Sequence, residues 1–182
     1  MSLWLCAHRP IHEVCIYFNQ HLLRGNRTQK ISSTRFDAFD SPNFPHLADV
    51  AIDINMATGL LLPMPSEPFH WQALRAQSIA NFRLCPGVSM DMLDALLQLP
   101  LKALVLETYG SGNAPNNTPR FLEMLHDASR RGIVVVNSSQ CAHGRVQMSQ
   151  YATGHALKAA GVLSGYDMTL EAIYCKLLYL LS

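Results

Sequence analysis

The sequence predicts an α/β protein whose second half is built around a parallel sheet. Short apolar runs at 103–106 and 133–136 have the continuous hydrophobic character of strands that are buried on both faces. Between them, 119–131 has apolar residues at helical spacing. Because a hairpin cannot contain a helix, the two strands must be joined by a crossover, which makes them parallel. The expected domain is therefore Rossmann-like.

Two further elements extend this pattern on its N-terminal side, and one closes the chain. The segment 78–85 suits a strand, and 90–99 has helical spacing with acidic residues near its start, before Pro100 stops it. The segment 170–181 is a closing helix. The alternation of strands and helices places helices on both faces of the sheet.

The first third of the chain predicts a hairpin followed by a loop. Residues 14–19 are rich in β-forming side chains, Gln20 and His21 are expected to make the turn, and 22–24 begin the return strand. From 25 to 41 charged, hydroxyl and amide residues dominate, and nearby prolines exclude a long regular element. We interpret this stretch as a functional loop of a preceding α/β domain.

A domain boundary is expected where prolines and a glycine interrupt an apolar stretch. Pro63, Pro65 and Pro68 follow Gly59 within ten residues. We therefore expect residues 1–55 to belong to one domain, 56–71 to form a linker, and 72–182 to form the second domain.

Composition excludes several classes of function. Fourteen basic and thirteen acidic residues give a net charge of +1, with no cationic block for a nucleic acid. The opening MSLWLCA is too short an apolar run for a signal peptide or a membrane span, so we expect a cytoplasmic protein. Five cysteines without a close pair, and eight scattered histidines, predict neither disulfides nor a metal site. No cofactor is expected.

The loop after the strand at 103–106 is the first place to look for function, because parallel sheets bind ligands beyond the carboxyl ends of their strands. It reads YGSGNAPN over 109–116. A glycine-rich turn alone more often marks a tight backbone than a ligand site, and this one is not GxGxxG and has no phosphate-binding lysine. Nucleotide binding is not indicated.

Several separate strings in the sequence carry a resemblance to a known family. In the second half they are LETYGSGNAPN, RGIVVVNSSQC, GRV, YATG and AGVLSGYDMT. In the first third they are EVCIYFNQHLLRGNRTQK and FDAFDSPNFP. From about Ala7 to Ser182 the chain resembles bacterial type I L-asparaginases, covering the end of their N-terminal domain and their whole C-terminal domain.

The resemblance implies an amidohydrolase that converts asparagine and water into aspartate and ammonia. In this family a threonine hydroxyl is the nucleophile, and it is activated through a threonine, a lysine and an aspartate. Lys30 ends the RGNRT.K block and matches that lysine. A lysine beside an aspartate can tune proton transfer to a hydroxyl. The alternative is a solvated hairpin lysine without a catalytic role.

The other catalytic motifs of the family do not occur in this sequence. The nucleophile belongs to a TGGT-type block and the second threonine to a TD pair, and neither TGG nor TD is present. The resemblance therefore implies that the chain begins inside the catalytic domain, with 3–7 as the tail of a helix. We expect the chain to be inactive unless a missing N-terminal half supplies these residues.

The resemblance also assigns the glycine-rich loop. In the family, which forms dimers of tight dimers, this loop reaches the active site of the neighbouring subunit. That implies a homodimer or homotetramer in which Tyr109, Gly110, Gly112 and Asn113 contact asparagine. The alternative for Asn113 is that it merely tolerates a left-handed turn.

A second, regulatory asparagine site exists in the cytosolic enzymes, and Cys141, with Ser139 nearby, matches the cysteine that lines it. Two positions depart from that pattern: Gln29 replaces a threonine, and Glu107 replaces an arginine. A glutamate repels the carboxylate that an arginine would bind. The simpler interpretation of Cys141 is therefore a strand-end thiol.

Two other classes of function stay open at this point. The first alternative to an asparaginase is a non-catalytic α/β binding or oligomerisation domain. The second is a relative of the amidotransferase subunit that deamidates glutamine for tRNA charging. The C-terminal string GYDMTLEA favours the free asparaginases.

Overall fold

The predicted parallel sheet forms the centre of the second half of the protein in its computed structural model, which describes residues 1–115, 119–150 and 152–182. Its order is β10-β9-β8-β7, and all three neighbouring pairs are parallel. The strands are β7 (Ile79–Arg83), β8 (Ala103–Thr108), β9 (Val134–Ser139) and β10 (Leu163–Ser164). This confirms the strands expected near 78–85, 103–108 and 133–138.

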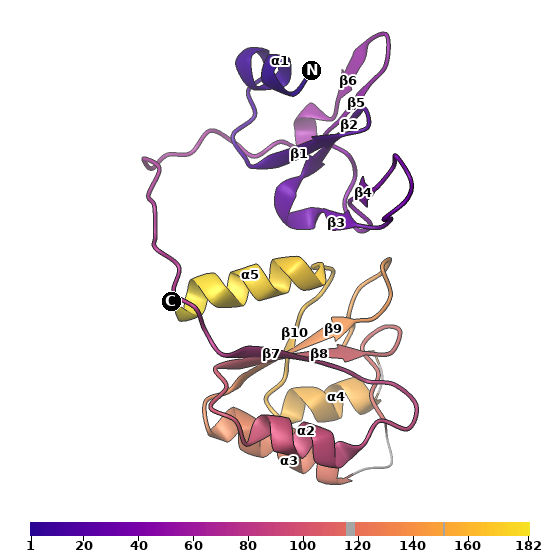
Figure 1. Cartoon of the computed structure of the whole chain (residues 1–182), viewed down its shortest axis with the longest axis vertical. Coiled ribbons are helices and arrows are strands. Elements are labelled where there is room, and N and C mark those ends of the chain that lie inside the picture. The colour runs from indigo at the N-terminus through magenta and orange to yellow at the C-terminus, as the bar shows by residue number, and fades with distance from the viewer. Residues whose placement is uncertain (116–118, 151) are drawn as a thin grey trace. The chain divides into compact units, whose positions relative to one another are not determined.

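Helices cover both faces of this sheet, as predicted (Figure 1). The helices α2, α3 and α4 lie on one face and α5 lies on the other. Their bounds are α2 (Met90–Leu97), α3 (Pro119–Arg130), α4 (Ala152–Ala159) and α5 (Leu170–Leu181). Along β8, Leu104 and Leu106 pack on the α2 and α3 side, while Ala103 and Val105 join Ile173 of α5. This alternation explains why the strand is apolar throughout.

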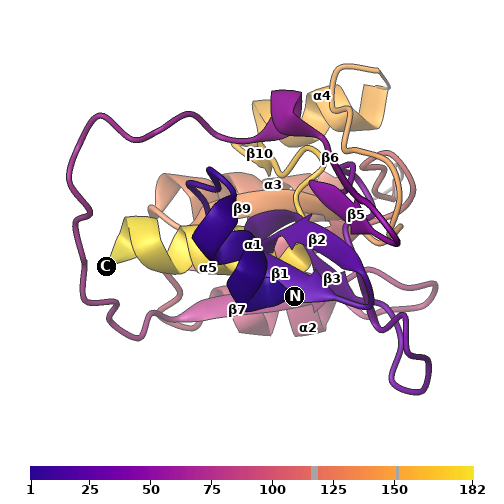
Figure 2. The ribbon, with the colours of Figure 1, turned by 90° about the horizontal axis from the view of Figure 1, so that it is seen from above.

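The first half of the chain contains an antiparallel sheet of order β1-β2-β5-β6. Its strands are β1 (Cys15–Phe18), β2 (His21–Arg24), β5 (Ala48–Val50) and β6 (Ile54–Met56). The helix α1 (Ser2–His8) lies against it, and Leu5 joins Leu22 and Leu47 in a small core (Figure 2).

The hairpin turn lies one residue earlier than predicted. Phe18 pairs with His21, so the turn consists of Asn19 and Gln20, and His21 is already part of β2. Both turn residues have positive φ, 41° and 68°. A two-residue turn of this kind matches the twist of the strands on either side.

The segment 25–41 is more regular than the loop that the sequence predicted. It contains the 3-10 turn η1 (Gly25–Arg27) and a short antiparallel pair, β3 (Gln29–Lys30) and β4 (Phe39–Asp40). The backbone N–H of Ile31 also donates to the carbonyl of Ala38, at 2.8 Å. Strands of two residues leave no hydrophobic pattern, which is why the sequence did not predict them.

The chain divides into two compact units, Met1–Gln72 and Ala73–Ser182. The division falls in a stretch from 61 to 78, after the 3-10 turn η2 (Thr58–Leu60), that contains no helix or strand. Among the described residues, no helix combines the length and apolar character that crossing a membrane would require.

Candidate functional site

The glycine-rich loop leaves β8 as a closed turn at the carboxyl end of the sheet. The N–H of Tyr109 donates to the carbonyl of Asn113 at 2.9 Å, and the N–H of Asn113 donates back at 2.8 Å. Within the turn, Gly110 and Gly112 have φ values of 51° and 106°. Residues with a side chain rarely adopt this left-handed backbone conformation, so the turn favours glycine at both positions. Asn116, the last residue of the predicted loop, lies outside the described residues.

A buried polar pair fixes the loop to the sheet. The hydroxyl of Thr108 donates to Asn137 Oδ1 at 2.6 Å, and Asn137 Nδ2 donates to the carbonyl of Gly112 at 3.1 Å. Thr108 and Asn137 are fully buried. A Cβ atom on Gly112 would approach Val146 Cγ1 to 2.8 Å. The loop is therefore held by β8, β9 and tight packing together.

Ser139 makes a second attachment at the end of β9. Its hydroxyl donates to the carbonyl of Gly110 at 2.6 Å and accepts from the N–H of Cys141 at 3.0 Å. The Cys141 residue itself is exposed. Two of the predicted regulatory residues thus adjoin the predicted substrate loop, with Ser139 acting as a backbone clamp.

The side chain of Asn113 is held by a residue that the sequence did not single out. Its Oδ1 accepts a hydrogen bond from Thr153 Oγ1, at 3.0 Å, near the start of α4. Among the described residues, the non-glycine residues with positive φ are Asn19, Gln20 and Tyr166. A left-handed turn is therefore not the reason for an asparagine at 113.

Glu107 has partners that change its predicted effect. Its carboxylate accepts from Asn81 Nδ2 at 2.7 Å and pairs with Arg83 Nη1 at 3.2 Å. Arg83 stands directly opposite Glu107 in the register of β7 and β8. The predicted repulsion of a carboxylate treats the glutamate charge as isolated, but the adjacent guanidinium of Arg83 offsets that charge. The sequence could not reveal this, because the pairing depends on strand register.

Lys30 and Gln29 lie in the first unit, on β3, whereas the other predicted site residues lie in the second. Lys30 pairs with Phe39, and its Nζ lies 5.6 Å from the centre of the Phe39 ring. Phe39 in turn contacts Phe18 edge to face, with centroids 5.1 Å apart. The lysine is exposed and lies over the aromatic ring at cation–π distance.

Next to η1, a nearly buried ion pair anchors the segment that leads to Lys30. Arg24 donates through two nitrogens to the carboxylate of Glu13 and also to the carbonyl of Leu60, at 2.7 Å. Burial alone would raise the pKa of Glu13, but hydrogen bonds from Arg24 and the Leu62 N–H lower it below its usual value. The sequence alone does not reveal this pair, because its members are eleven residues apart.

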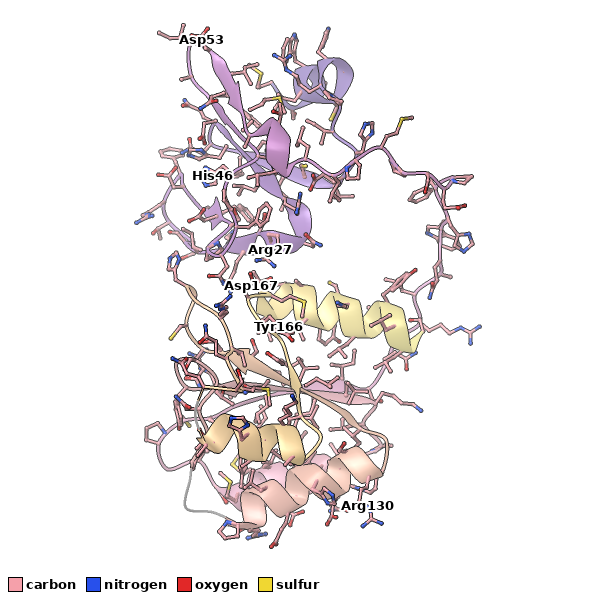
Figure 3. The ribbon with its side chains drawn as sticks, turned by 180° about the vertical axis from the view of Figure 1, so that it is seen from behind. Arg27, His46, Asp53, Arg130, Tyr166 and Asp167 are labelled. Atoms are coloured by element: carbon pink, nitrogen blue, oxygen red, sulfur yellow. The ribbon has the colours of Figure 1, made fainter. Side chains whose placement is uncertain are left out.

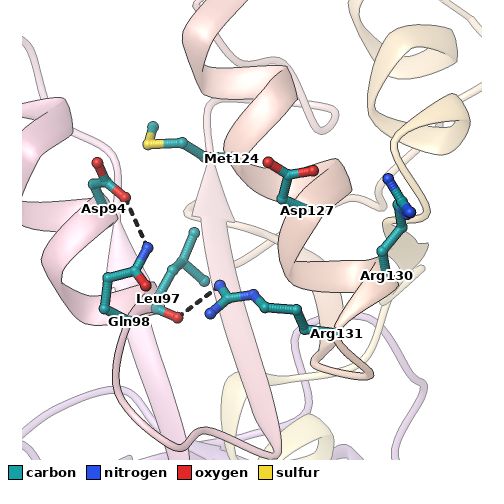
Figure 4. A pocket seen from close by; sticks show the side chains of 7 residues that line it. All are labelled: Asp94, Leu97, Gln98, Met124, Asp127, Arg130 and Arg131. Carbon is teal, nitrogen blue, oxygen red and sulfur yellow. Dashed lines mark hydrogen bonds between the residues drawn. The ribbon is translucent and has the colours of Figure 1, made fainter.

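A pocket of about 480 Å³ lies between the C-terminal ends of α2 and α3 (Figure 4). Here Gln98 bonds to Asp94 at 3.3 Å, and Arg131 donates to the carbonyl of Leu97 at 2.8 Å. These helix ends lead into the amino ends of the strands, so the pocket is at the opposite edge of the sheet from the glycine-rich loop. A smaller pocket of about 190 Å³ adjoins the loop between Ala114 and Thr153.

Both units of the chain match known protein families. Residues 78–182 match the family described as "Glutaminase/Asparaginase C-terminal domain", and residues 1–61 match "Asparaginase, N-terminal". The chain is 46% identical over 181 residues to L-asparaginase 1 of Escherichia coli (strain K12), with 100% of this chain and 53% of that protein covered. It is 41% identical to the human 60 kDa lysophospholipase, with 99% of this chain and 31% of that protein covered.

A solved structure shares the fold. The crystal structure of L-asparaginase I from Vibrio cholerae superposes with a TM-score of 0.91 at 43% identity, covering 99% of this chain and 54% of that one. The chain spans about half the length of these two L-asparaginases. Both of its units correspond to parts of one protein family, and the chain belongs to the glutaminase/asparaginase family.

Proposed function

We propose that this chain works as part of an L-asparaginase, an amidohydrolase that converts asparagine and water into aspartate and ammonia. The observation that carries the proposal is the glycine-rich loop, which Asn137 and Ser139 hold at the carboxyl edge of the parallel sheet. This is the edge at which α/β proteins bind ligands. Similarity along the whole chain to proteins named L-asparaginase supports the choice of reaction.

Lys30 is the residue that we assign to the chemistry. Amide hydrolysis through a covalent intermediate needs a hydroxyl that loses its proton as it attacks the amide carbon, after which ammonia leaves and water cleaves the ester. An amine that exchanges a proton with that hydroxyl lowers the barrier to the attack. Lys30 supplies such an amine on an ordered strand beside Phe39.

The loop residues Tyr109, Gly110, Gly112 and Asn113 are proposed to contact asparagine bound in a neighbouring subunit of a homodimer or homotetramer. Thr153 fixes the orientation of the Asn113 amide, which offers both a donor and an acceptor. These match the acceptor and donor of a substrate amide.

The regulatory role of Gln29, Glu107, Ser139 and Cys141 is less well supported than a structural one. Ser139 bonds to the loop backbone, and Glu107 pairs with Arg83 and Asn81. The polar groups of Ser139 and Glu107 are engaged within the second unit, which favours positioning of the loop over binding of a second asparagine.

We further propose that the chain is inactive by itself. It contains neither TGG nor TD, the strings that carry the two threonines of the mechanism. Lysine without the hydroxyl that it serves has no nucleophile to activate, and members of one catalytic unit retain little activity separately.

Two alternatives to the asparaginase proposal are a binding or oligomerisation domain without chemistry, and a protein that takes part in the deamidation of glutamine.

Ammonia release from asparagine and from glutamine tests these proposals. The purified chain is expected to release none, and adding a second polypeptide that bears both threonine motifs is expected to restore turnover with asparagine. In that mixture Lys30→Ala should abolish turnover, and Lys102→Ala, another exposed lysine, should not. Asparaginase activity of the chain alone that Lys30→Ala abolishes would overturn the assignment of the catalytic residues.

A further inference from the structure

Three side chains that are well separated in sequence meet at one place in the first unit. His21 Nδ1 lies 2.7 Å from Asp49 Oδ1, and His46 Nδ1 lies 2.9 Å from the same oxygen. Among the residues that the structure describes, these three form the group able to hold a metal ion, with donor atoms within 4.8 Å of one another. We propose that they bind a divalent first-row transition metal, with Zn²⁺ as the best match.

The fold brings these residues together on regular structure. His21 opens β2 and stands directly opposite Asp49 of β5. His46 comes three residues before Asp49, next to β5, and its ring lies 4.4 Å from that of His21 between centroids. Figure 3 shows His46 beside the strands of this unit. Because paired strands fix two of the three ligands, binding would need little ordering of the backbone.

The donor set suits zinc better than a hard cation. Imidazole nitrogens favour zinc and its neighbours, whereas magnesium and calcium prefer oxygen ligands. Ligand atoms about 2.0 Å from a tetrahedral zinc ion lie about 3.3 Å apart. The observed separations of 2.7 and 2.9 Å therefore need to widen by only about half an ångström. The metal would replace the hydrogen bonds between each Nδ1 and Asp49.

Asp40 provides independent support for a metal site. Its Oδ1 lies 3.2 Å from His46 Nε2, the ring nitrogen on the opposite side of the imidazole from the nitrogen that contacts Asp49. A histidine that binds a metal through one nitrogen usually donates its other N–H to a carboxylate, which fixes the tautomer. Asp40 also accepts from the N–H of Ser41 at 2.7 Å, so its position is itself fixed. With both carboxylates ionised, the charge of a dication is balanced.

The metal site would be accessible to solvent, and it would be linked to the segment that carries Lys30. The side chains of His21, His46 and Asp49 are 38%, 30% and 56% exposed, which leaves room for water as a fourth ligand. Asp40 belongs to β4 and pairs with Gln29, the neighbour of Lys30. A metal bound here would join β2 and β5 to the β3–β4 pair.

Calorimetric titration of the full chain with Zn²⁺ tests the proposal. The expected result is one ion per chain, with at least tenfold weaker binding in His46→Ala and in Asp49→Asn. Asp40→Asn should weaken binding about tenfold, since partners of metal ligands typically contribute ten- to a hundredfold. His70→Ala, which removes an exposed histidine outside the cluster, should leave binding unchanged. Mg²⁺ should not compete.

Exposed cysteines are the main competing ligands, so Co²⁺ absorption serves as a second measurement. Bound through nitrogen and oxygen, Co²⁺ should show ligand-field bands without a thiolate charge-transfer band. Circular dichroism establishes whether each variant is folded. If His46→Ala does not fold, the isosteric variant Asp49→Asn provides the test of binding. No Zn²⁺ binding by the wild-type chain, equal binding by His46→Ala and His70→Ala, or a thiolate band would each overturn the proposal.

Discussion

Asn137, in the second half of β9, donates from its side-chain amide to the backbone carbonyl of Gly112 in the glycine-rich loop, at 3.1 Å. The asparagine is completely buried, and its other side-chain atom accepts from Thr108 at 2.6 Å. A single side chain therefore satisfies two buried polar groups and sets the conformation of the loop. The shape of the proposed substrate loop depends on this residue, which never reaches the surface.

Replacing Asn137 with alanine is expected to destabilise the protein by about 1–3 kcal/mol. The Gly112 carbonyl would lose its buried donor, and the Thr108 hydroxyl would keep only its longer bond to the Ser138 carbonyl, at 3.3 Å. Urea unfolding of Asn137→Ala, Thr108→Val and the double variant measures this. The double variant should cost less than the sum of the single ones, since both changes remove the same bond between Thr108 and Asn137. Strict additivity would contradict the network.

Gly112→Ala should cost about 1–3 kcal/mol more than Gly87→Ala. Both glycines have positive φ, 106° and 82°, so alanine strains the backbone at each by about 1 kcal/mol. Only at 112 does a Cβ atom meet Val146 at 2.8 Å, whereas nothing lies within 4 Å of it at 87. The difference between the two unfolding free energies isolates the steric contribution, and Val146→Ala should recover part of it. Equal costs would show that the loop moves to accommodate the methyl group.

The pH dependence of stability should reveal the Arg24–Glu13 pair. The pKa of Glu13 is lower in the folded protein than its usual 4.5, so its ionised form is favoured by folding. Its contribution is fully present above the unfolded-state pKa and is lost as the pH falls through the folded-state pKa. We expect the free energy of unfolding to decline from about pH 5 downward. Glu13→Gln should lower it by about 1–2 kcal/mol at neutral pH and should flatten that decline.

The matched control for this measurement is Glu67→Gln, which changes an exposed glutamate in the stretch from 61 to 78 that contains no helix or strand. It should leave both the neutral-pH stability and the acid limb unchanged. If Glu13→Gln and Glu67→Gln gave the same pH profile, the buried pair would not contribute to acid sensitivity.

The parts of the fold that sequence predicts are those whose burial produces a simple pattern. The β8 strand is apolar along its length because helices cover both faces, and its pattern is readable without any partner. In contrast, β10 has two residues, and α4 has weak helical periodicity with a glycine at 154 packed on Met148. Neither was predicted.

Sequence motifs indicated the candidate site residues but not the residues that hold them in place. The loop and Lys30 were visible because motifs spanned them. Asn137, Thr153 and Arg83 were not, because the role of each depends on a partner brought close by strand register or helix docking. The same reason hid His21, His46 and Asp49, which are scattered in sequence and adjacent in the folded unit.

The hydrogen bond between Thr153 and Asn113 predicts a change in side-chain order that is separable from stability. Thr153→Val keeps the shape of the side chain but removes the hydroxyl that donates to Asn113 Oδ1. Stability should fall by about 0.5–1.5 kcal/mol, the usual contribution of one hydrogen bond. The Asn113 amide should then sample several orientations, visible as broadened or shifted side-chain NH₂ signals in NMR spectra. Thr34→Val, which changes an exposed threonine in the first unit, should leave those signals unchanged.

Because asparagine binding is proposed to need one fixed orientation of the Asn113 amide, Thr153→Val should raise KM in a reconstituted asparaginase more than it lowers kcat. Unchanged Asn113 signals would show that other contacts fix this side chain and that Thr153 does not position it.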